Sequence, residues 1–213
     1  MDTPVTQPPE GGEGPSGPAP LPAAQPARAP RNSIWNRNIN RRSSREWALQ
    51  MLFRLDVLPP EGTLDDFFAE FWQQQADILI EIADGDPDAL KEFDSKANRV
   101  YRIFAEELVR GVWENRDAID ARIEGYLTNW TLSRMGGVDR NVLRVAFYEL
   151  FFREDAPPVV IINEAVDVAK YFSTRDSGKF VNGILDRASH EVTRDARDVP
   201  WRKGRHDKKK HQP

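Results

Sequence analysis

The chain has 213 residues, a net charge of −4 and no cysteine. This length suits one domain with tails. The absence of cysteine excludes disulfides, thiolate metal sites and cysteine nucleophiles, and it fits a cytoplasmic protein. No run of about 18 apolar residues occurs, so we expect no membrane-spanning helix and no membrane partner.

Charge is unevenly distributed along the chain. Residues 14–45 contain six arginines and no acidic residue, and residues 201–213 contain six basic residues and one acid. The intervening residues 46–200 carry a net charge of −12. An acidic body with basic ends is expected to hold RNA at one edge, because the body itself repels phosphate.

The two ends differ in composition from the body. Residues 1–30 hold nine of the sixteen prolines, with little apolar surface to bury. We therefore predict a disordered tail over residues 1–35 and a basic, disordered tail over residues 194–213. Residues 36–193 are predicted to form the single folded domain.

The first half of the body shows helical spacing of apolar residues. A first helix is predicted from residue 41 to Pro59-Pro60, a second after an N-cap at Thr63, a third through residues 100–112, and a fourth over residues 117–130. The segment Asp84–Pro87 reads as a turn. The predicted inner face of the first helix is Ala48, Met51, Leu52 and Leu55, and that of the second is Leu64, Phe67, Phe68, Phe71 and Trp72. The third helix is predicted to bury Val100, Ile103, Phe104, Leu108 and Val112, and the fourth Ile119, Ile123 and Leu127.

The second half follows a break at Gly136-Gly137. Residues 138–152 are apolar on most sides, which is typical of a buried central helix. A sixth helix is predicted over residues 161–172, and a seventh begins at a cap formed by Asp176 or Ser177. Within it, Gly183 is expected to permit close approach of another helix. Strand alternation is not found in the sequence, so the predicted fold is all-α, a single bundle of about seven helices.

Motifs for catalysis are not found in the sequence. The three histidines lack zinc-ligand spacing, and the sequence contains neither a GxGxxG motif after a strand nor a GxxxxGK[ST] loop. Acidic residues on amphipathic helices are usually the solvated face. We therefore expect no metal, no cofactor and no enzymatic activity, and a binding function instead.

An arginine-rich segment leads into the first helix. On a helical wheel Phe53 lies on the same stripe as Arg42, away from the core stripe, and Arg45 flanks them. Arginines beside an aromatic outside the core suit single-stranded RNA, because guanidinium groups bind phosphate and the ring stacks on an unstacked base. The alternative is that Phe53 packs on a neighbouring helix, as most helical aromatics do.

A second candidate segment is Asp176-Ser177-Gly178-Lys179-Phe180. A helix start offers free N–H groups and the positive end of the helix dipole to phosphate, and Lys179 adds charge there. Ordinary capping and packing is the alternative interpretation.

Four blocks, taken together and in this order, resemble the NusB family. They lie between about Arg41 and Ala188, and they are Arg42…Arg45-Glu46-x-Ala48-Leu49-Gln50-Met51-Leu52-Phe53, residues 138–150 (VDRNVLRVAFYEL), residues 158–170 (PVVIINEAVDVAK) and residues 179–186 (KFVNGILD). The two tails and a longer segment around residues 78–96 depart from the family pattern.

The resemblance implies a helical transcription antitermination factor. Such a protein binds boxA-type single-stranded RNA in ribosomal RNA leader transcripts together with NusE, a small-subunit ribosomal protein, so that the RNA polymerase antitermination complex reads through terminators. The RNA-binding residues implied are Arg41, Arg42, Arg45, Gln50, Phe53, Asp176, Lys179 and Phe180. A partner face on the fourth to sixth helices would include Asp139, Arg144 and Glu149, although Arg144 or Glu149 could instead pair internally.

Two alternatives stay open at this point. A related helical domain precedes the catalytic domain of rRNA cytosine methyltransferases, so the chain could be a detached accessory domain of that kind. It could also be a protein-only scaffold, as a homodimer, that has lost RNA binding. The Arg41–Arg45 cluster argues against such a loss.

Overall fold

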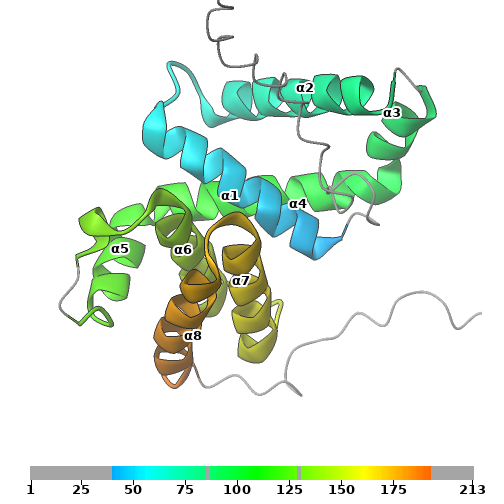
Figure 1. Cartoon of the computed structure of the whole chain (residues 1–213). Coiled ribbons are helices and arrows are strands. Elements are labelled where there is room, and N and C mark those ends of the chain that lie inside the picture. Colours follow the sequence, from blue (N-terminus) through cyan, green and yellow to red (C-terminus); the bar gives the residue numbers. More distant parts are fainter. Residues whose placement is uncertain (1–39, 85–86, 129–130, 193–213) are drawn as a thin grey trace, which may run out of the picture.

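The computed structural model describes residues 40–84, 87–128 and 131–192, and every regular element in these ranges is a helix (Figure 1). This confirms the all-α prediction; the tails predicted at 1–35 and 194–213 lie outside the described residues. Within those ranges, no helix combines the length and apolarity that a bilayer crossing requires. The elements are α1 (Arg41–Val57), α2 (Leu64–Ile82), α3 (Pro87–Phe93), α4 (Lys96–Glu114), α5 (Arg116–Glu124), the 3₁₀ turn η2 (Leu132–Arg134), α6 (Gly137–Phe152), α7 (Pro158–Phe172) and α8 (Arg175–Ser189).

Helices α1 to α4 form the N-terminal half, in which α1 crosses α4 and α2 runs along the direction of α4 (Figure 1). Large aromatic side chains fill the space between them. The Trp72 ring of α2 meets the Trp47 ring of α1 edge-on at 5.2 Å, and its indole N–H donates to Glu106 of α4. Each such aromatic pair stabilises the fold by more than its buried area alone. These side-chain contacts hold α2 against α1 and α4.

Helix α6 is the centre of the C-terminal half and packs against α1, α4, α5, α7 and α8. Its apolar side chains are buried on nearly all sides, as predicted. The buried residues are Val142, Leu143, Val145, Ala146, Phe147 and Leu150. Because α6 contacts helices of both halves, it fixes α1 relative to α7 and α8.

The helix starts agree with the sequence at one of the two predicted caps. Asn40 and Thr63 cap α1 and α2 with capping boxes, the second as predicted. At α8, however, the cap is Thr174, whose hydroxyl accepts the Ser177 N–H at 3.1 Å. The prediction of a cap at Asp176 or Ser177 was wrong by two or three residues, and Asp176 lies in the first turn of the helix instead.

Two helix predictions were incomplete. The turn near residue 84 exists, with Asp84 at a φ of 51°, but Pro87 then begins the short helix α3, because proline is well tolerated at a first helical position. Helix α5 ends at Glu124, before Gly125, which is a weak helix former. In α4, Phe104, Leu108 and Val112 are buried as predicted, whereas Val100 and Ile103 near its start are exposed.

Candidate nucleic-acid interface

Arg41 and Arg42 lie at the start of α1 and are partly exposed, but both meet carboxylates. Arg41 bonds to Asp155 at 2.6 Å, and its guanidinium lies 4.4 Å from the centroid of the Phe104 ring. Arg42 donates to Glu164 at 2.8 and 3.1 Å and to Asp167 at 2.8 Å. A phosphate would therefore compete with acidic side chains of this chain for both guanidinium groups.

Burial and the Arg42 contacts act in opposite directions on Glu164. Burial alone would raise the pKa of the Glu164 carboxyl, but the hydrogen bonds and charge of Arg42 outweigh it, and the pKa is lowered. Glu164 is therefore ionised at neutral pH and holds Arg42 against α7.

Arg45 differs from its two neighbours because it is buried. Its side chain is 5% exposed, and it forms a two-pronged ion pair with Glu149 of α6, with both N···O distances at 2.7 Å. The Glu149 side chain is 1% exposed. The expectation that Arg45 faces RNA and Glu149 faces a partner is therefore corrected: the helical wheel placed Arg45 beside the surface stripe, but α6 covers it.

Phe53 lies three turns along α1 from Arg42, and 42% of it is exposed. One edge of its ring rests on Gly137 at the start of α6, where an added Cβ would lie 2.9 Å from a ring carbon. Phe53 therefore combines the two interpretations of the sequence, since it packs on a neighbouring helix and still presents a face to solvent. Gln50, one turn earlier, is half-buried.

The start of α6 connects α1 to the start of α8. Gly137 carries the Phe53 ring, and two residues later the Asp139 carboxylate accepts a hydrogen bond from the Ser177 hydroxyl at 3.0 Å. Asp139, expected on a partner face, is thus a half-buried residue that orients α8. The first turn of α8 consequently lies beside the Phe53 side of α1.

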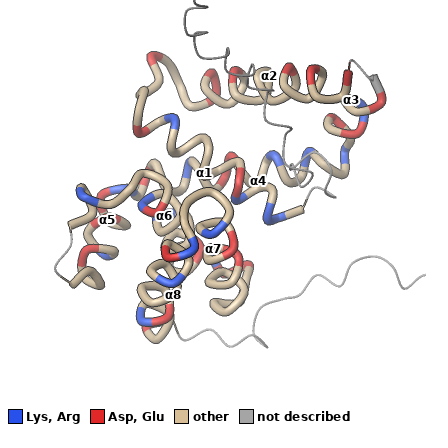
Figure 2. Tube along the Cα trace, in the orientation of Figure 1, with Lys and Arg blue, Asp and Glu red and all other residues tan. Residues whose placement is uncertain are grey.

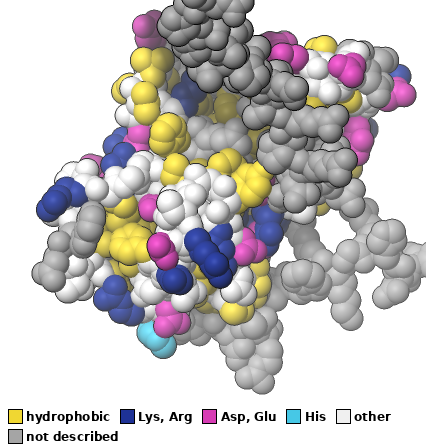
Figure 3. All heavy atoms as spheres, in the orientation of Figure 1, with side chains coloured by type: hydrophobic (Ala, Val, Ile, Leu, Met, Phe, Trp, Pro, Cys, Tyr) yellow, Lys and Arg dark blue, Asp and Glu magenta, His cyan; other side chains and the backbone are white. Residues whose placement is uncertain are grey.

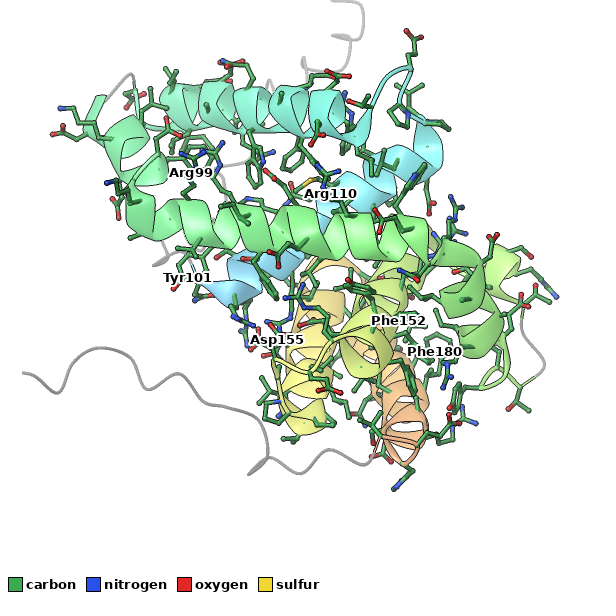
Figure 4. All side chains as sticks on the ribbon, turned by 180° about the vertical axis from the view of Figure 1, so that it is seen from behind. Arg99, Tyr101, Arg110, Phe152, Asp155 and Phe180 are labelled. Carbon is green, nitrogen blue, oxygen red and sulfur yellow. The ribbon has the colours of Figure 1, made fainter. Side chains whose placement is uncertain are left out.

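The predicted residues Asp176, Lys179 and Phe180 are exposed in the first two turns of α8. Lys179 pairs with Asp176 at 3.2 Å, and both side chains are more than three quarters exposed. Such a surface pair is weak, so Lys179 is available to an anion. Phe180 is 37% exposed (Figure 4). The expectation that Gly183 admits a neighbouring helix was wrong, because a Cβ added there would meet no atom of the described residues within 4 Å.

The charge pattern agrees with this placement. Figure 2 shows acidic residues along α2, which contains no lysine or arginine, whereas basic residues mark α1 and the region of α7 and α8. In Figure 3, lysine and arginine side chains lie in front of α7 and α8 with acidic side chains between them, close to hydrophobic surface. The structure places Arg42, Gln50 and Phe53 on α1 and Asp176, Lys179 and Phe180 in the first two turns of α8, while Arg41 pairs with Asp155.

The remaining partner candidate, Arg144, is also buried. It is 4% exposed and binds Asp120 of α5 and Asp56 of α1, with N···O distances of 2.7 to 3.0 Å. Arg140 donates to Asp56 as well. These ion pairs join α1, α5 and α6, so Arg144 holds three helices together, as the internal-pairing alternative supposed.

Asp56 is the centre of that network. Burial alone would raise its pKa, but hydrogen bonds from Arg140 and Asn141 and the charge of Arg144 outweigh burial and lower the pKa. Asp56 therefore stays ionised through the neutral range.

Sequence reasoning missed the acids that neutralise the arginines and an aromatic surface at the end of α6. Phe152 at the end of α6 is 44% exposed and stacks on Tyr148 with ring centroids 5.7 Å apart (Figure 4). Tyr148 in turn covers Gly111 of α4, where a Cβ would lie 1.8 Å from a ring carbon. We call Tyr148 and Phe152 the aromatic pair. Their spacing of four residues is the signal that could have found them.

Comparisons with known proteins agree with these observations. The chain is 41% identical over 152 residues to the transcription antitermination protein NusB of Syntrophotalea carbinolica, covering 70% of this chain and 91% of that one. A structure described as T. maritima NusB superposes with a TM-score of 0.52 at 34% identity, covering 74% of this chain and 96% of that one. A structure of antitermination factors NusB and NusE in complex with dsRNA gives a TM-score of 0.53 at 26% identity, covering 71% and 96%.

The match to the family extends over nearly all of the described residues. The sequence profile of the NusB family matches residues 42–190, which run from the start of α1 to just past the end of α8. The arrangement of helices, the four sequence blocks and the relatives all lead to one classification. The chain belongs to the NusB family.

Proposed function

We propose that this chain is a transcription antitermination factor that acts by binding and carries out no catalysis. It binds boxA-type single-stranded RNA of ribosomal RNA leader transcripts together with NusE, and RNA polymerase in the resulting complex reads through terminators. Its site of action is the cytoplasm. The family membership and the relatives named as antitermination proteins support the role, and the described NusB–NusE–dsRNA structure supports the two partners.

The observation that carries the proposal is the joining of α1 and α8 into one surface. Phe53 rests on the start of α6, which also holds the start of α8 through the Asp139–Ser177 bond. Helix α1 carries the exposed ring of Phe53 and the cation Arg42, and α8 carries the exposed ring of Phe180 and the cation Lys179. Rings that stack on bases next to cations that bind phosphate are the usual means of holding a single strand.

We place the NusE contact at the aromatic pair. Exposed aromatic residues surrounded by polar surface are typical of protein interfaces. Phe152 is exposed there, and Val159 and Val160 at the start of α7 are also exposed. This surface lies on α6 and α7, within the region that the family resemblance implies, and it replaces the buried Arg144 and Glu149.

The experiment is an RNA-binding titration with the purified chain, with NusE and without it. Acidic residues of this chain compete with RNA phosphates for Arg41 and Arg42, so the chain alone is expected to bind boxA RNA weakly. NusE is expected to raise that affinity. A scrambled RNA of equal length measures the part of the affinity that comes from phosphates alone. Equal affinity for boxA and scrambled RNA with NusE present would overturn the proposal.

A further inference from the structure

Asp155 joins the start of α1 to the short connection between α6 and α7. Its Oδ2 accepts from the Nη1 of Arg41 at 2.6 Å, and its Oδ1 accepts from the Nε of Arg153 at 3.0 Å. The side chain of Asp155 is 30% exposed and that of Arg41 is 50% exposed, so an RNA phosphate can reach this contact. Figure 4 shows Asp155 below α4, on the same side of the molecule as Phe152.

The carboxylate of Asp155 serves two guanidinium groups. Burial alone would raise the pKa of Asp155, but the hydrogen bonds and charges of Arg153 and Arg41 outweigh burial and lower the pKa. Asp155 is therefore ionised at neutral pH. The same two arginines also lie over the ring of Phe104, at 4.4 Å from its centroid for Arg41 and 5.0 Å for Arg153.

The two arginines belong to different parts of the fold. Arg153 and Asp155 both lie in residues 153–157, the connection between α6 and α7, and move together with it. Arg41 lies on α1, which packs against α4 and α6. A displacement of the connection therefore breaks the contact of Asp155 with Arg41 before its contact with Arg153. A shift of about 1 Å suffices, because a hydrogen bond between nitrogen and oxygen weakens beyond roughly 3.2 Å.

The surface proposed for NusE lies on both sides of this connection. Phe152 precedes it at the end of α6, and Val159 and Val160 follow it at the start of α7, and all three are exposed. The prolines at 157 and 158 restrict the backbone there. A partner seated on both sides covers the connection, and an adjustment of its backbone on binding is passed directly to Asp155.

We propose that Asp155 is a positioning residue through which the binding of NusE controls Arg41. In the chain alone, Asp155 holds Arg41 and competes with phosphate. When NusE occupies Phe152 and Val159, the connection carries Asp155 and Arg153 away from Arg41, which then binds an RNA phosphate. The inference rests on the proposed function, because it assigns to one side chain the coupling between the two proposed partners.

The decisive variant is Asp155→Asn in the full-length protein, titrated with boxA RNA in the absence of NusE and at saturating NusE. Asparagine has nearly the same size and holds Arg41 more weakly. The RNA affinity of the chain alone should rise a few fold, and the affinity with NusE should stay near the wild-type value. The factor by which NusE raises RNA affinity should therefore fall by about threefold or more, and RNA should raise NusE affinity by the same smaller factor.

Asp167→Asn is the matched control. It removes the same charge from an acid that pairs with Arg42, on α7 and outside the connection. It should raise RNA affinity by the same factor with and without NusE, so the factor due to NusE stays at the wild-type value. Melting temperatures of both variants establish that the binding measurements are made on folded protein.

Arg153→Gln should change RNA binding in the opposite direction. It leaves the carboxylate of Asp155 to Arg41 alone, so Arg41 is held more tightly. The RNA affinity of the chain alone should fall below that of Lys91→Gln, which removes one positive charge from the exposed surface of α3. A merely structural role of Asp155 would instead lower the RNA affinity of both Asp155→Asn and Arg153→Gln.

The outcomes separate this proposal from the proposed function. If Asp155→Asn folds and the factor due to NusE equals that of the wild type, the role of Asp155 is refuted and the proposed function stands. An RNA affinity of Arg153→Gln at or above that of Lys91→Gln refutes the same role, even where Asp155→Asn does not fold. If the wild type with NusE binds boxA and scrambled RNA equally, both proposals fail.

Discussion

Arg45 of α1 and Glu149 of α6 form a buried ion pair whose two N···O distances are both 2.7 Å. The sequence predicted that Arg45 binds RNA and that Glu149 binds a protein partner, but the two side chains bind each other instead. The pair sets the position of the first turn of α1, and with it the partly exposed Arg41 and Arg42. Its contribution to RNA binding is therefore the positioning of α1 on α6.

Replacing Glu149 by glutamine should destabilise the fold. Removing one partner of a buried pair leaves an uncompensated charge and costs on the order of 3–5 kcal/mol. Glu164 lies 3.8 Å from Arg45 and partly compensates, so we expect about 3 kcal/mol. Urea unfolding at pH 7 measures the loss of free energy. The control is Asp88→Asn, which removes an exposed pair with Lys91 and should change stability by less than about 0.5 kcal/mol. A Glu149→Gln protein as stable as this control would contradict the prediction.

Replacing Asp167 by asparagine should strengthen RNA binding. Asp167 is 45% exposed and takes part of the charge of Arg42, so its neutralisation leaves Arg42 freer to meet a phosphate. We expect an affinity gain of a few fold at low salt that fades as salt rises, because exposed charges are screened. Filter binding at several salt concentrations checks this. The control Asp88→Asn makes the same change of charge on the remote helix α3 and should give a much smaller gain in RNA affinity. Equal gains in the two variants would mean that only the net charge of the protein affects RNA binding.

Replacing Phe53 by alanine should weaken RNA binding by more than its moderate effect on stability explains. If a base stacks on its exposed face, RNA binding weakens by about 1–3 kcal/mol, and the salt slope stays the same because no charge is removed. The ring also rests on Gly137, so we expect a moderate loss of stability, below the 3–5 kcal/mol of a fully buried phenylalanine. Melting temperature and RNA affinity are measured on the same sample at a temperature where the variant is fully folded. Unchanged RNA affinity there would remove Phe53 from the site.

Replacing Phe152 by alanine should weaken NusE binding and leave binding of RNA by the chain alone unchanged. A central aromatic of an interface contributes on the order of 2 kcal/mol or more, and Phe152 is exposed, so the fold should tolerate its loss. Calorimetric titration with NusE measures the effect. Leu58→Ala, an exposed apolar residue after the end of α1, serves as the control. Wild-type affinity of Phe152→Ala for NusE would move the partner surface elsewhere.

The Asp56 network should make stability depend on acid pH. The folded-state pKa of Asp56 lies below its ordinary value of 3.8, so its stabilising contribution is complete well above pH 3.8 and is lost as the pH falls through the lower folded-state value. Asp56→Asn lacks this carboxylate and should be less stable than the wild type at pH 7. The difference in unfolding free energy should narrow between about pH 4 and pH 2. A constant difference from pH 7 to pH 2 would exclude this role for Asp56.

Local sequence signals were sufficient for most of the helices and for the exposed Phe53. Periodicity located α1, α2, α6 and α8, because an apolar stripe needs only residues three and four apart. The same reasoning brought Phe53 forward as an aromatic outside the core, whereas Phe180 was named through the family resemblance. Helix α3 was missed, because a proline after a turn is equally compatible with a loop and with a first helical residue.

The roles of charged residues could not be read in this way. Arg45 and Glu149 are 104 positions apart, and Arg42 and Glu164 are 122 apart, so the pairing depends on tertiary packing that one helical wheel cannot contain. The same holds for Asp155, whose partner Arg41 lies 114 positions earlier in the chain.

The α2–α3 end of the molecule lies opposite α8 (Figure 1). Phe93 of α3 packs on Trp47 and Trp72, so the end is anchored, while Asp88 beside the turn is 79% exposed at its side chain. Because the chain has no cysteine, a single thiol introduced at Asp88 would be the only one available to a maleimide dye. Fluorescence anisotropy or energy transfer from that position would then report RNA and NusE binding from a point outside both proposed contact surfaces.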